Sequence, residues 1–242
     1  MDPRYAAAYG AIARTHWWWA ARDTVVLRTI AALRRGQPRG RLLDIGCGDG
    51  RLLDVLAADH DVVGIEPDPA TGATALAGRY AIHRCAFTSP LPIEGPFDVV
   101  MMLDVLEHLG DPVAALRLAA SLLGEHGALV ITVPAGPALW TTHDDLNHHH
   151  RRYTRHGLDG ELHQAGLVAS SSRYFFHALG LAKLVVRGLE TMHRKRPAVP
   201  RVPPEPINTL ARTFSAIEFR ATAPLARVLP GSSLLAVATR RR

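Results

Sequence analysis

The sequence predicts an α/β fold in which a mostly parallel sheet is covered by helices on both faces. Short apolar segments alternate with helical ones across residues 41–133, which is typical of βαβ units. Glycine-rich or acidic sequences directly follow several of the apolar segments. In such sheets, the ligand site lies at the carboxyl ends of the strands. A chain of 242 residues is within the size range of one large domain.

Each element has its own local signal. Residues 4–35 predict a helix, because they are rich in alanine, leucine and arginine and contain no proline after Pro3. Breaking residues follow at Gly36, Pro38 and Gly40. Strands are then expected at 41–45, 62–65, 80–84, 97–103 and 128–133. Helices are expected between them at 51–58, 69–78 and 112–123, the last with Asp111 as N-cap and Pro112 in its first turn.

The pattern changes after Pro134. Residues 134–153 are rich in His, Asp and Arg and predict a functional loop or lid. The proline-rich, charged residues 194–206 predict a flexible or extended connection. The remaining expected elements are a helix at 154–165, a strand at 167–174, an apolar segment with basic positions at 175–190, a helix at 207–228 broken at Pro224, and a strand at 232–239.

Composition narrows the class of protein. Hydrophobic residues make up 48% and charged residues 21%, which fits a globular domain and excludes disordered, coiled-coil and collagen-like chains. The sequence contains no apolar run of about 18 residues and no secretory leader pattern. Its two cysteines, Cys47 and Cys85, are too few for a disulfide scaffold or a zinc–thiolate cluster. A reducing, cytoplasmic location is therefore expected.

The net charge of +6 and the pI of about 9.9 permit an anionic partner. Nucleic acid, a phosphate-bearing metabolite and an acidic membrane surface are the three options. An arginine- and alanine-rich composition, typical of GC-rich genomes, explains the same charge without any such partner.

The most informative segment is LLDIGCGDG, Leu42–Gly50. Its glycines let the backbone turn tightly and pass close to a ligand. Glu66 ends the next apolar segment, 22 residues after Asp44, where a carboxylate is placed to bind ribose hydroxyls. Together these features predict a nucleoside cofactor.

The acidic character of the loop selects among nucleosides. Asp44 and Asp49 would repel a pyrophosphate, which disfavours a dinucleotide and an NAD-dependent oxidoreductase. The same carboxylates suit a cationic ligand with an amino group and a sulfonium. The sequence therefore favours S-adenosylmethionine.

Four motifs in order, LDIGCGDG, GIEPDP, PFDVVMMLDVLEHL and ALVITVPA, resemble class I S-adenosylmethionine-dependent methyltransferases of the ubiquinone-type, small-molecule subgroup. The resemblance covers residues 40–175. It implies a Rossmann-like, seven-stranded sheet whose last strand, at 232–239, is antiparallel. It also implies one domain over 1–242, with a helical cap at 1–39, a cofactor-binding core at 40–175, a helical insertion over the substrate pocket at 176–231 and the final strand at 232–242.

The resemblance also implies roles for individual residues. Asp44 and the backbone of Gly46, Cys47, Gly48 and Gly50 would hold the methionine end of the cofactor. Glu66 would bind the ribose, with Pro67 and Leu103 lining the site. Many relatives place an Asp against the adenine amino group, whereas Phe87 stands near that position here and would contact the adenine by its ring. Arg22, on the first helix, would meet the methionine carboxylate.

The DVLEH block suggests a metal. If residues 104–108 begin a helical turn, then Asp104, Glu107 and His108 share one face and could bind Mg²⁺ or Mn²⁺. The block resembles the E-x-x-E-H of ubiquinone-type O-methyltransferases and small-RNA 2′-O-methyltransferases, with Asp in the first place. The RNA enzymes add a later histidine, and His149 falls in a similar place. The alternative is that Glu107 and His108 only orient loops by hydrogen bonds.

These features predict methyl transfer to a small or lipid-like acceptor, with oxygen as the favoured acceptor atom. His143, His149 and His108 are the candidate general bases, and Arg151 and Arg152 could grip an anionic acceptor. An RNA 2′-O- or base methyltransferase and a non-catalytic nucleoside-binding scaffold are the alternatives. The apolar 175–190 segment could rest on a membrane surface, but a helical cap is preferred because no amphipathic pattern is evident by eye.

Overall fold

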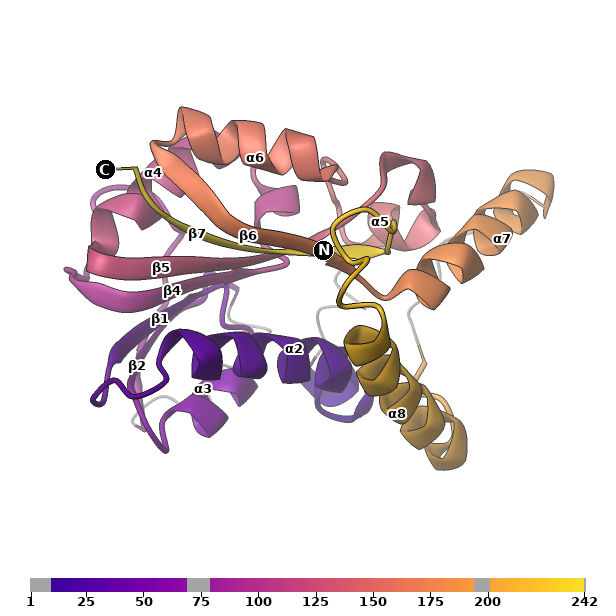
Figure 1. Cartoon of the computed structure of the whole chain (residues 1–242), viewed down its shortest axis with the longest axis horizontal. Helices are drawn as coiled ribbons and strands as arrows, with labels where there is room; N and C mark the ends of the chain where they lie inside the picture. The colour runs from indigo at the N-terminus through magenta and orange to yellow at the C-terminus, as the bar shows by residue number, and fades with distance from the viewer. Residues whose placement is uncertain (1–9, 69–78, 194–200, 242) are drawn as a thin grey trace.

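Seven strands form a single sheet in the order β3-β2-β1-β4-β5-β7-β6 (Figure 1). The structure is a computed structural model that describes residues 10–68, 79–193 and 201–241. Strands β1 to β5 pair in parallel, and β7 is antiparallel to both β5 and β6. The strands are β1 (Arg41–Ile45), β2 (Asp61–Ile65), β3 (Ala81–His83), β4 (Phe97–Leu103), β5 (Leu123–Pro134), β6 (Leu167–Phe175) and β7 (Ser233–Arg240). The predicted seven-stranded sheet with an antiparallel last strand is confirmed.

Helices cover both faces of the sheet (Figure 1). One face packs against α2 and α3, and the other packs against α4 and α6. The long helices are α2 (Trp17–Leu33), α4 (Pro112–Leu122), α6 (Arg155–Gln164), α7 (His177–His193) and α8 (Glu205–Ala221). The short ones are α3 (Arg51–Leu56), α5 (Thr142–Leu146), η3 (Leu106–His108) and η4 (Pro137–Leu139). None of the described helices has both the length and the apolar composition that crossing a membrane requires.

The buried core explains why the central strands could be predicted. Leu42 and Leu43 of β1 are both fully buried, and they belong to apolar clusters on opposite sides of the sheet. A strand that is buried on both faces is apolar along its whole length and does not alternate. The run Phe97–Leu103 has this character because β4 lies between β1 and β5.

The N-terminal helix differs from its prediction. Within the described residues, a helical segment at 10–15 ends at His16, which has an extended backbone and N-caps α2. Asn208 of α8 bridges this break: its amide donates to Thr15 O at 2.7 Å and its Oδ1 accepts from Trp17 N at 2.8 Å. A contact between residues 191 positions apart cannot be read from local helix propensity.

Other boundaries also move. Strand β5 starts five residues before the predicted one, at Leu123, and α8 ends at Ala221 instead of 228. The predicted lid at 134–153 is partly ordered, since it contains η4 and α5. The helix predicted at 69–78 and the first part of the connection predicted at 194–206 lie outside the described residues.

Candidate active site

The glycine loop follows β1 at the carboxyl edge of the sheet. Gly46 has a φ of +73°, and a Cβ there would lie 2.7 Å from Cγ2 of Val105. Its N–H and that of Cys47 both donate to Ile65 O of β2, at 2.8 and 3.1 Å. Only glycine therefore fits this turn, because the conformation and the close neighbour both disfavour a side chain.

Glu66 connects the ends of the two adjacent strands. Its Oε2 accepts from Gly48 N at 2.8 Å and its Oε1 from Asp68 N at 2.8 Å. Burial raises the pKa of this carboxyl, and the two backbone donors oppose the rise. Glu66 thus holds the glycine loop in shape, and its ribose-binding role remains a prediction.

A small cavity lies beside this loop. Six of the cofactor candidates are in its wall, together with Ala13 from the segment that precedes α2. The full lining is Ala13, Arg22, Asp44, Gly46, Cys47, Gly48, Asp49, Arg51, Leu52 and Leu103. Asp44 is buried, and its Oδ1 has no hydrogen-bond partner among the described residues. Burial raises its pKa to about 7, against the opposing charge of Arg22. An unpartnered buried carboxyl is suited to a cationic ligand group.

Ion pairs fasten the N-terminal helices over this cavity. Arg22 of α2 contacts Asp104 at 2.8 Å and Asp23 at 3.0 Å. Arg51 of α3 also pairs with Asp23, and Arg14 reaches Asp49 at 2.9 Å. Arg22 is therefore on the cavity wall, where its guanidinium is engaged by carboxylates, and its contact with the methionine carboxylate remains a prediction.

The turn after β4 corrects one expectation. Residues 104–108 do not form a single helical turn: only η3, residues 106–108, is helical. Asp104 precedes it with a φ of +57°, a left-handed conformation that Asp tolerates better than most residues. Its carboxylate consequently faces Arg22 and not the other acidic and histidine side chains of the block.

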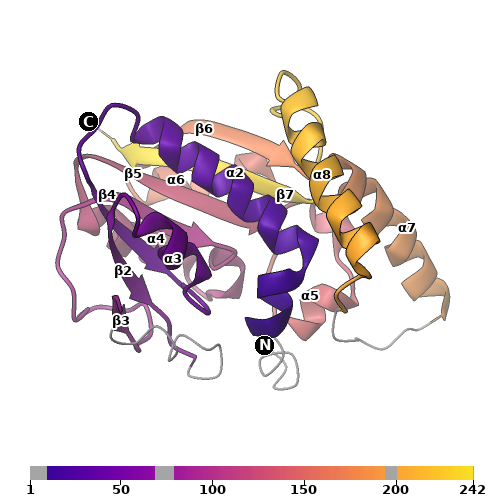
Figure 2. The same ribbon diagram turned by 90° about the horizontal axis from the view of Figure 1, so that it is seen from below.

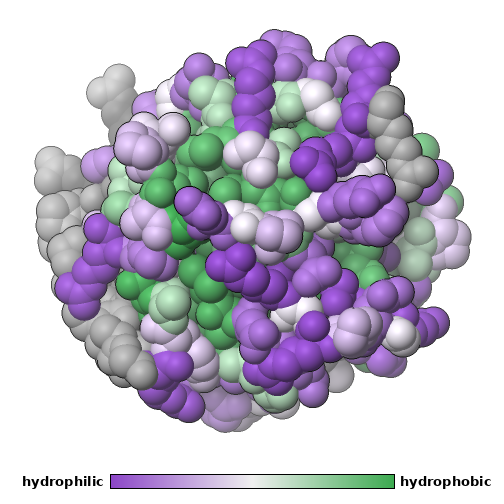
Figure 3. Space-filling view, turned by 90° about the vertical axis from the view of Figure 1, so that its left-hand side faces the viewer, coloured by the Kyte–Doolittle hydropathy of each residue, from purple (hydrophilic) through white to green (hydrophobic). Residues whose placement is uncertain are grey.

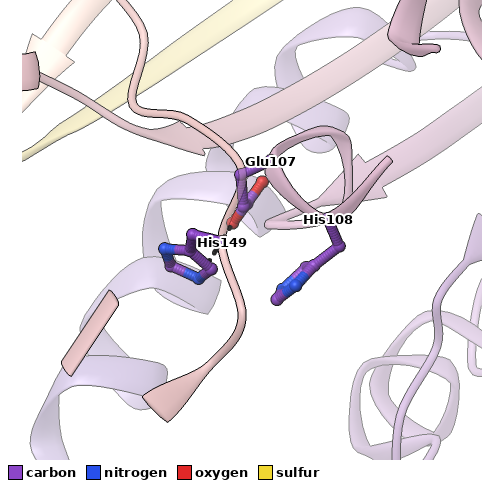
Figure 4. A group of neighbouring side chains, drawn as sticks. All are labelled: Glu107, His108 and His149. Carbon is purple, nitrogen blue, oxygen red and sulfur yellow. Dashed lines mark ion pairs between the residues drawn. The ribbon is translucent and has the colours of Figure 1, made fainter. Parts of the chain in front are cut away.

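Glu107, His108 and His149 do come together (Figure 4). One ligand atom from each lies within 4.8 Å of the other two, and His149 Nε2 is 3.9 Å from Glu107 Oε1. The loop carrying His149 is held against η3, because His150 N donates to Glu107 O at 2.8 Å. Three of the four predicted metal ligands thus form a cluster, and Asp104 lies outside it.

His149 is oriented by a buried carboxylate that the sequence reading did not select. Its Nδ1 is 2.8 Å from Asp144 Oδ1, and Arg152 Nε donates to the same oxygen at 2.8 Å. These contacts hold the pKa of Asp144 below its ordinary value despite burial. Because the ionised Asp144 accepts the Nδ1 proton, the lone pair of His149 is on Nε2, on the side of Glu107.

Burial shifts the pKa values of the other two members of the cluster in opposite directions. Glu107 is fully buried, and neither of its carboxylate oxygens has a hydrogen-bond partner among the described residues. Burial, reinforced by the nearby Asp104, raises the pKa of Glu107 well above its ordinary value. Burial and the neighbouring His149 lower the pKa of His108 to about 4, so its imidazole is neutral at pH 7.

His143, the third candidate base, lies in α5 outside the cluster. Its Nε2 is 3.1 Å from Asn147 Nδ2, so the amide is the donor and the ring nitrogen the acceptor. Burial, with Lys183 of α7 nearby, lowers the pKa of His143 to about 4. Burial also lowers the pKa of Lys183 to about 8. His143 is thus available only as a neutral imidazole at pH 7.

The two lid arginines have structural partners. Arg152 is 7% exposed and bridges Asp144 and Ala135 O, so the predicted grip on an anionic acceptor is wrong for this side chain. Arg151 donates to Leu109 O and Gly110 O. Phe87 is partly buried against one of the apolar core clusters. Its contact with adenine remains a prediction, as does the place of Pro67 in the cofactor site.

Two important residues, Asp144 and Asp23, were not selected from the sequence. Asp144 had a local signal, because Thr141-x-x-Asp144 is a helix-capping pattern, and the structure forms that capping box. Asp23, which holds Arg22 and Arg51, is a lone acidic residue in an apolar helix. Nothing local indicates that it is buried against two arginines.

Comparisons with known proteins agree with this geometry. A family model described as a methyltransferase domain matches residues 18–171. A ubiquinone biosynthesis O-methyltransferase from Azorhizobium caulinodans is 29% identical over 158 residues, which are 54% of this chain and 62% of that protein. The chain spans about half the length of the curated relatives that it matches.

Solved structures share the fold. A SAM-dependent methyltransferase from Archaeoglobus fulgidus has a TM-score of 0.56 and 18% identity, covering 90% of this chain and 92% of that one. The cyclase SpnF has a TM-score of 0.61 and 18% identity, covering 98% and 94%. Since one neighbour is described as a cyclase, likeness at this level shows the architecture and not the reaction.

Proposed function

Because the chain belongs to the methyltransferase-domain family and carries an S-adenosylmethionine-dependent methyltransferase domain, we propose that the whole protein methylates a hydroxyl oxygen of a small, lipid-like acceptor. The cluster of Glu107, His108 and His149 carries this proposal. It follows β4 on the same edge of the sheet as the cavity at the glycine loop. The Azorhizobium relative is named as an O-methyltransferase, and this supports an oxygen acceptor.

We further propose that this cluster binds Mg²⁺ or Mn²⁺. The donor set fits such an ion: Glu107 offers two unpartnered oxygens, His108 is neutral, and His149 presents Nε2. The Asp144–His149 contact is the outer hydrogen bond that orients metal-ligating histidines. The 4.8 Å span exceeds the about 4.2 Å between opposite ligands of these ions, so a small side-chain movement must accompany binding.

The chain has two tasks in this reaction. Asp44, Glu66 and the glycine loop hold and orient the cofactor, whose sulfonium supplies an electrophilic methyl carbon and keeps the electron pair of the broken C–S bond. The histidine–glutamate cluster holds the acceptor hydroxyl, and a bound divalent ion would lower the pKa of that hydroxyl. Without an ion, His149 backed by Asp144 is the group placed to take the proton.

An apolar groove supports a lipid-like acceptor. It lies where α2, α7 and α8 meet, and its walls include Trp17, Leu179 and Phe214. Trp17 and Trp18 contact Phe176 edge-on or tilted, and the Arg22 guanidinium lies 5.6 Å from the Trp18 ring. Aromatic side chains thus connect the groove to the cofactor cavity. A hydrocarbon tail fits such a lining.

The test measures S-adenosylhomocysteine release with catechol and with 4-octylcatechol as acceptors. The proposal expects methyl ether formation, a lower KM for the octyl compound, stimulation by Mn²⁺ and loss of turnover in His149→Ala with cofactor affinity retained.

Methylation only at nitrogen or carbon would contradict the oxygen assignment. If EDTA leaves activity intact and added Mn²⁺ does not raise it, the metal is excluded and His149 remains as the base. Turnover only on RNA, with steep salt dependence, would establish the RNA alternative.

We also propose that the protein is located in the cytoplasm. Both cysteines, Cys47 and Cys85, are free thiols, which agrees with a reducing compartment.

A further inference from the structure

Exposed apolar side chains are concentrated in one part of the molecule. Of the 16 large hydrophobic residues that are exposed in the described chain, 13 lie between Leu181 and Leu229. Single exposed apolar residues are ordinary on protein surfaces, but a concentration of this kind marks an interaction surface. It belongs to α7, α8 and the segment that follows α8.

Helix α7 has two distinct sides. Leu181, Leu184, Val185 and Leu189 recur every three or four residues, and each is at least 43% exposed. The opposite side contacts the lid, because Glu190 accepts from Thr142 N and Oγ1 at 3.0 and 2.7 Å. The sequence-based judgement that this segment lacks an amphipathic pattern is therefore wrong. The outward side is an apolar stripe.

Helix α8 repeats the arrangement. Ile207, Leu210, Phe214 and Ile217 form a second stripe, each at least 51% exposed. Glu218 joins the two helices, since its carboxylate accepts from His177 N and Ala178 N at 3.1 and 2.6 Å. Both helices extend away from the sheet at the same end of the molecule (Figures 1 and 2). The two stripes are thus held on one projecting unit.

The exposed charged side chains around the stripes are mostly basic. Five arginines are exposed on or beside the two helices: Arg187, Arg201, Arg212, Arg220 and Arg227. Of the described acidic residues in the same part of the chain, Glu190 and Glu218 are used by the contacts given above, and Glu205 is exposed. A second copy of this chain would bring like charges together. An anionic surface is complementary.

We propose that the stripes of α7 and α8 dock on the surface of an anionic lipid bilayer. Amphipathic helices with basic residues beside an apolar face bind in the headgroup region by burying that face. Each nearby arginine adds electrostatic attraction to an anionic leaflet. At the opposite end of the molecule, hydrophilic side chains surround and cross an area of apolar ones near the centre of the face (Figure 3).

Docking at this place orients the enzyme. The inner side of α7 contacts the lid at Thr142, two residues from Asp144. The groove that contains Trp17 and Phe214 lies between the two docking helices. A bilayer bound at the stripes therefore lies beside the groove. Binding itself requires neither cofactor nor acceptor, so it can be measured independently of methyl transfer.

The test is flotation of the full chain with phosphatidylcholine vesicles, with and without about 30% phosphatidylglycerol. We expect tight partitioning to the anionic vesicles only, weakened by about 0.5 M NaCl. The double variant Leu181→Gln, Leu210→Gln should partition at least about tenfold more weakly, because it removes apolar area from both stripes. Val168→Gln, which changes an exposed apolar residue on β6, should bind like the parent.

A charge variant gives a second measurement. Arg212→Gln should weaken binding to anionic vesicles by about fivefold, whereas Arg35→Gln, an exposed arginine distant in sequence from α7 and α8, should not. Equal binding to neutral and anionic vesicles, or full binding by the double leucine variant, would overturn the proposal. Concentration-dependent dimers that the leucine variant abolishes, without vesicle binding, would assign the surface to a second copy instead.

Discussion

Asp144 and Glu107 are both completely buried carboxyls, and His149 lies between them. Asp144 contacts His149 and Arg152, and its Oδ2 accepts from Thr141 N at 2.9 Å. Neither carboxylate oxygen of Glu107 has a hydrogen-bond partner among the described residues. Their pKa values accordingly move in opposite directions from the ordinary carboxyl range, down for Asp144 and up for Glu107.

The difference shows how a buried acid can serve structure or function. A carboxylate surrounded by donors stabilises the fold and fixes its neighbours. When a buried carboxyl has no hydrogen-bond donors around it, its ionised form is destabilised. Proteins retain such groups mainly where a ligand or an ion supplies the missing interactions. We therefore assign Asp144 to positioning and Glu107 to ligand binding, and the following variants test that division.

The largest expected effect is on stability in Asp144→Asn. Removing this charge leaves Arg152 buried and unpaired, so the free energy of unfolding should fall by about 3–5 kcal/mol at pH 7. The pKa of Asp144 is lowered by folding, so its contribution is complete above about pH 4 and is lost as the pH falls further. Urea unfolding at pH 7 and pH 3 should show the difference between variant and parent shrinking in acid. The matched control is Asp145→Asn, an exposed neighbour; an equal loss in both variants would contradict the assignment.

Glu107→Gln should act on function instead. We expect Mn²⁺ affinity and turnover to fall at least about 100-fold, because the only acidic ligand of the cluster is removed. Without metal the free energy of unfolding should not fall, since the raised pKa means that ionising Glu107 costs stability increasingly as the pH rises above about 4.5. Calorimetric titration with Mn²⁺ and thermal unfolding at pH 8 measure the two parts. Glu125→Gln, at an exposed site, should change neither, and unaltered Mn²⁺ binding in Glu107→Gln would remove the metal site.

At the cofactor end, Asp44→Asn should weaken S-adenosylmethionine binding by about 1.5–3 kcal/mol. Burial raises the pKa of Asp44 to about 7, and a cationic ligand requires the ionised form. Affinity of the parent protein should therefore fall as the pH is lowered from 8 to 6, while the affinity of the variant should change little. Calorimetry across this range, with Asp59→Asn as the exposed control, makes the comparison. A pH-independent parent would show that Asp44 does not meet the cationic group.

The smallest effect is expected for His143→Ala. His143 is neutral at pH 7 and its Nε2 already accepts from Asn147, so kcat should fall less than about tenfold. His149→Ala should lose much more. Steady-state kinetics of both variants between pH 6 and 9 rank the two residues, and a greater loss in His143→Ala would transfer the role of base to it.

Much of the architecture was predictable because its signals are local. The apolar segment Phe97–Leu103 and the glycine loop with Asp44 and Glu66 follow from burial on both faces and from backbone geometry. The helical segment 10–15, the break at His16 and the start of α2 were predicted as one helix, because the contact that bridges them comes from Asn208 in α8. The amphipathic stripe of α7 does have a local pattern, since Leu181, Leu184 and Leu189 recur at helical spacing and are exposed. Which side of α7 packs inward was decided by contacts with the lid and with α8.

The sequence by itself determined the order of strands and helices, the glycine turn and the acids at the strand ends, since these depend on hydrophobic pattern and backbone conformation. Only the tertiary structure decided which charges meet. It pairs Arg22 with Asp104, leaves Asp104 outside the cluster of Glu107, His108 and His149, and gives the Asp144 carboxylate hydrogen-bond partners while the Glu107 carboxylate has none among the described residues. The physical reason is that the energy of a buried charge depends on the neighbours that folding brings to it, and neighbours distant in the chain leave no local pattern.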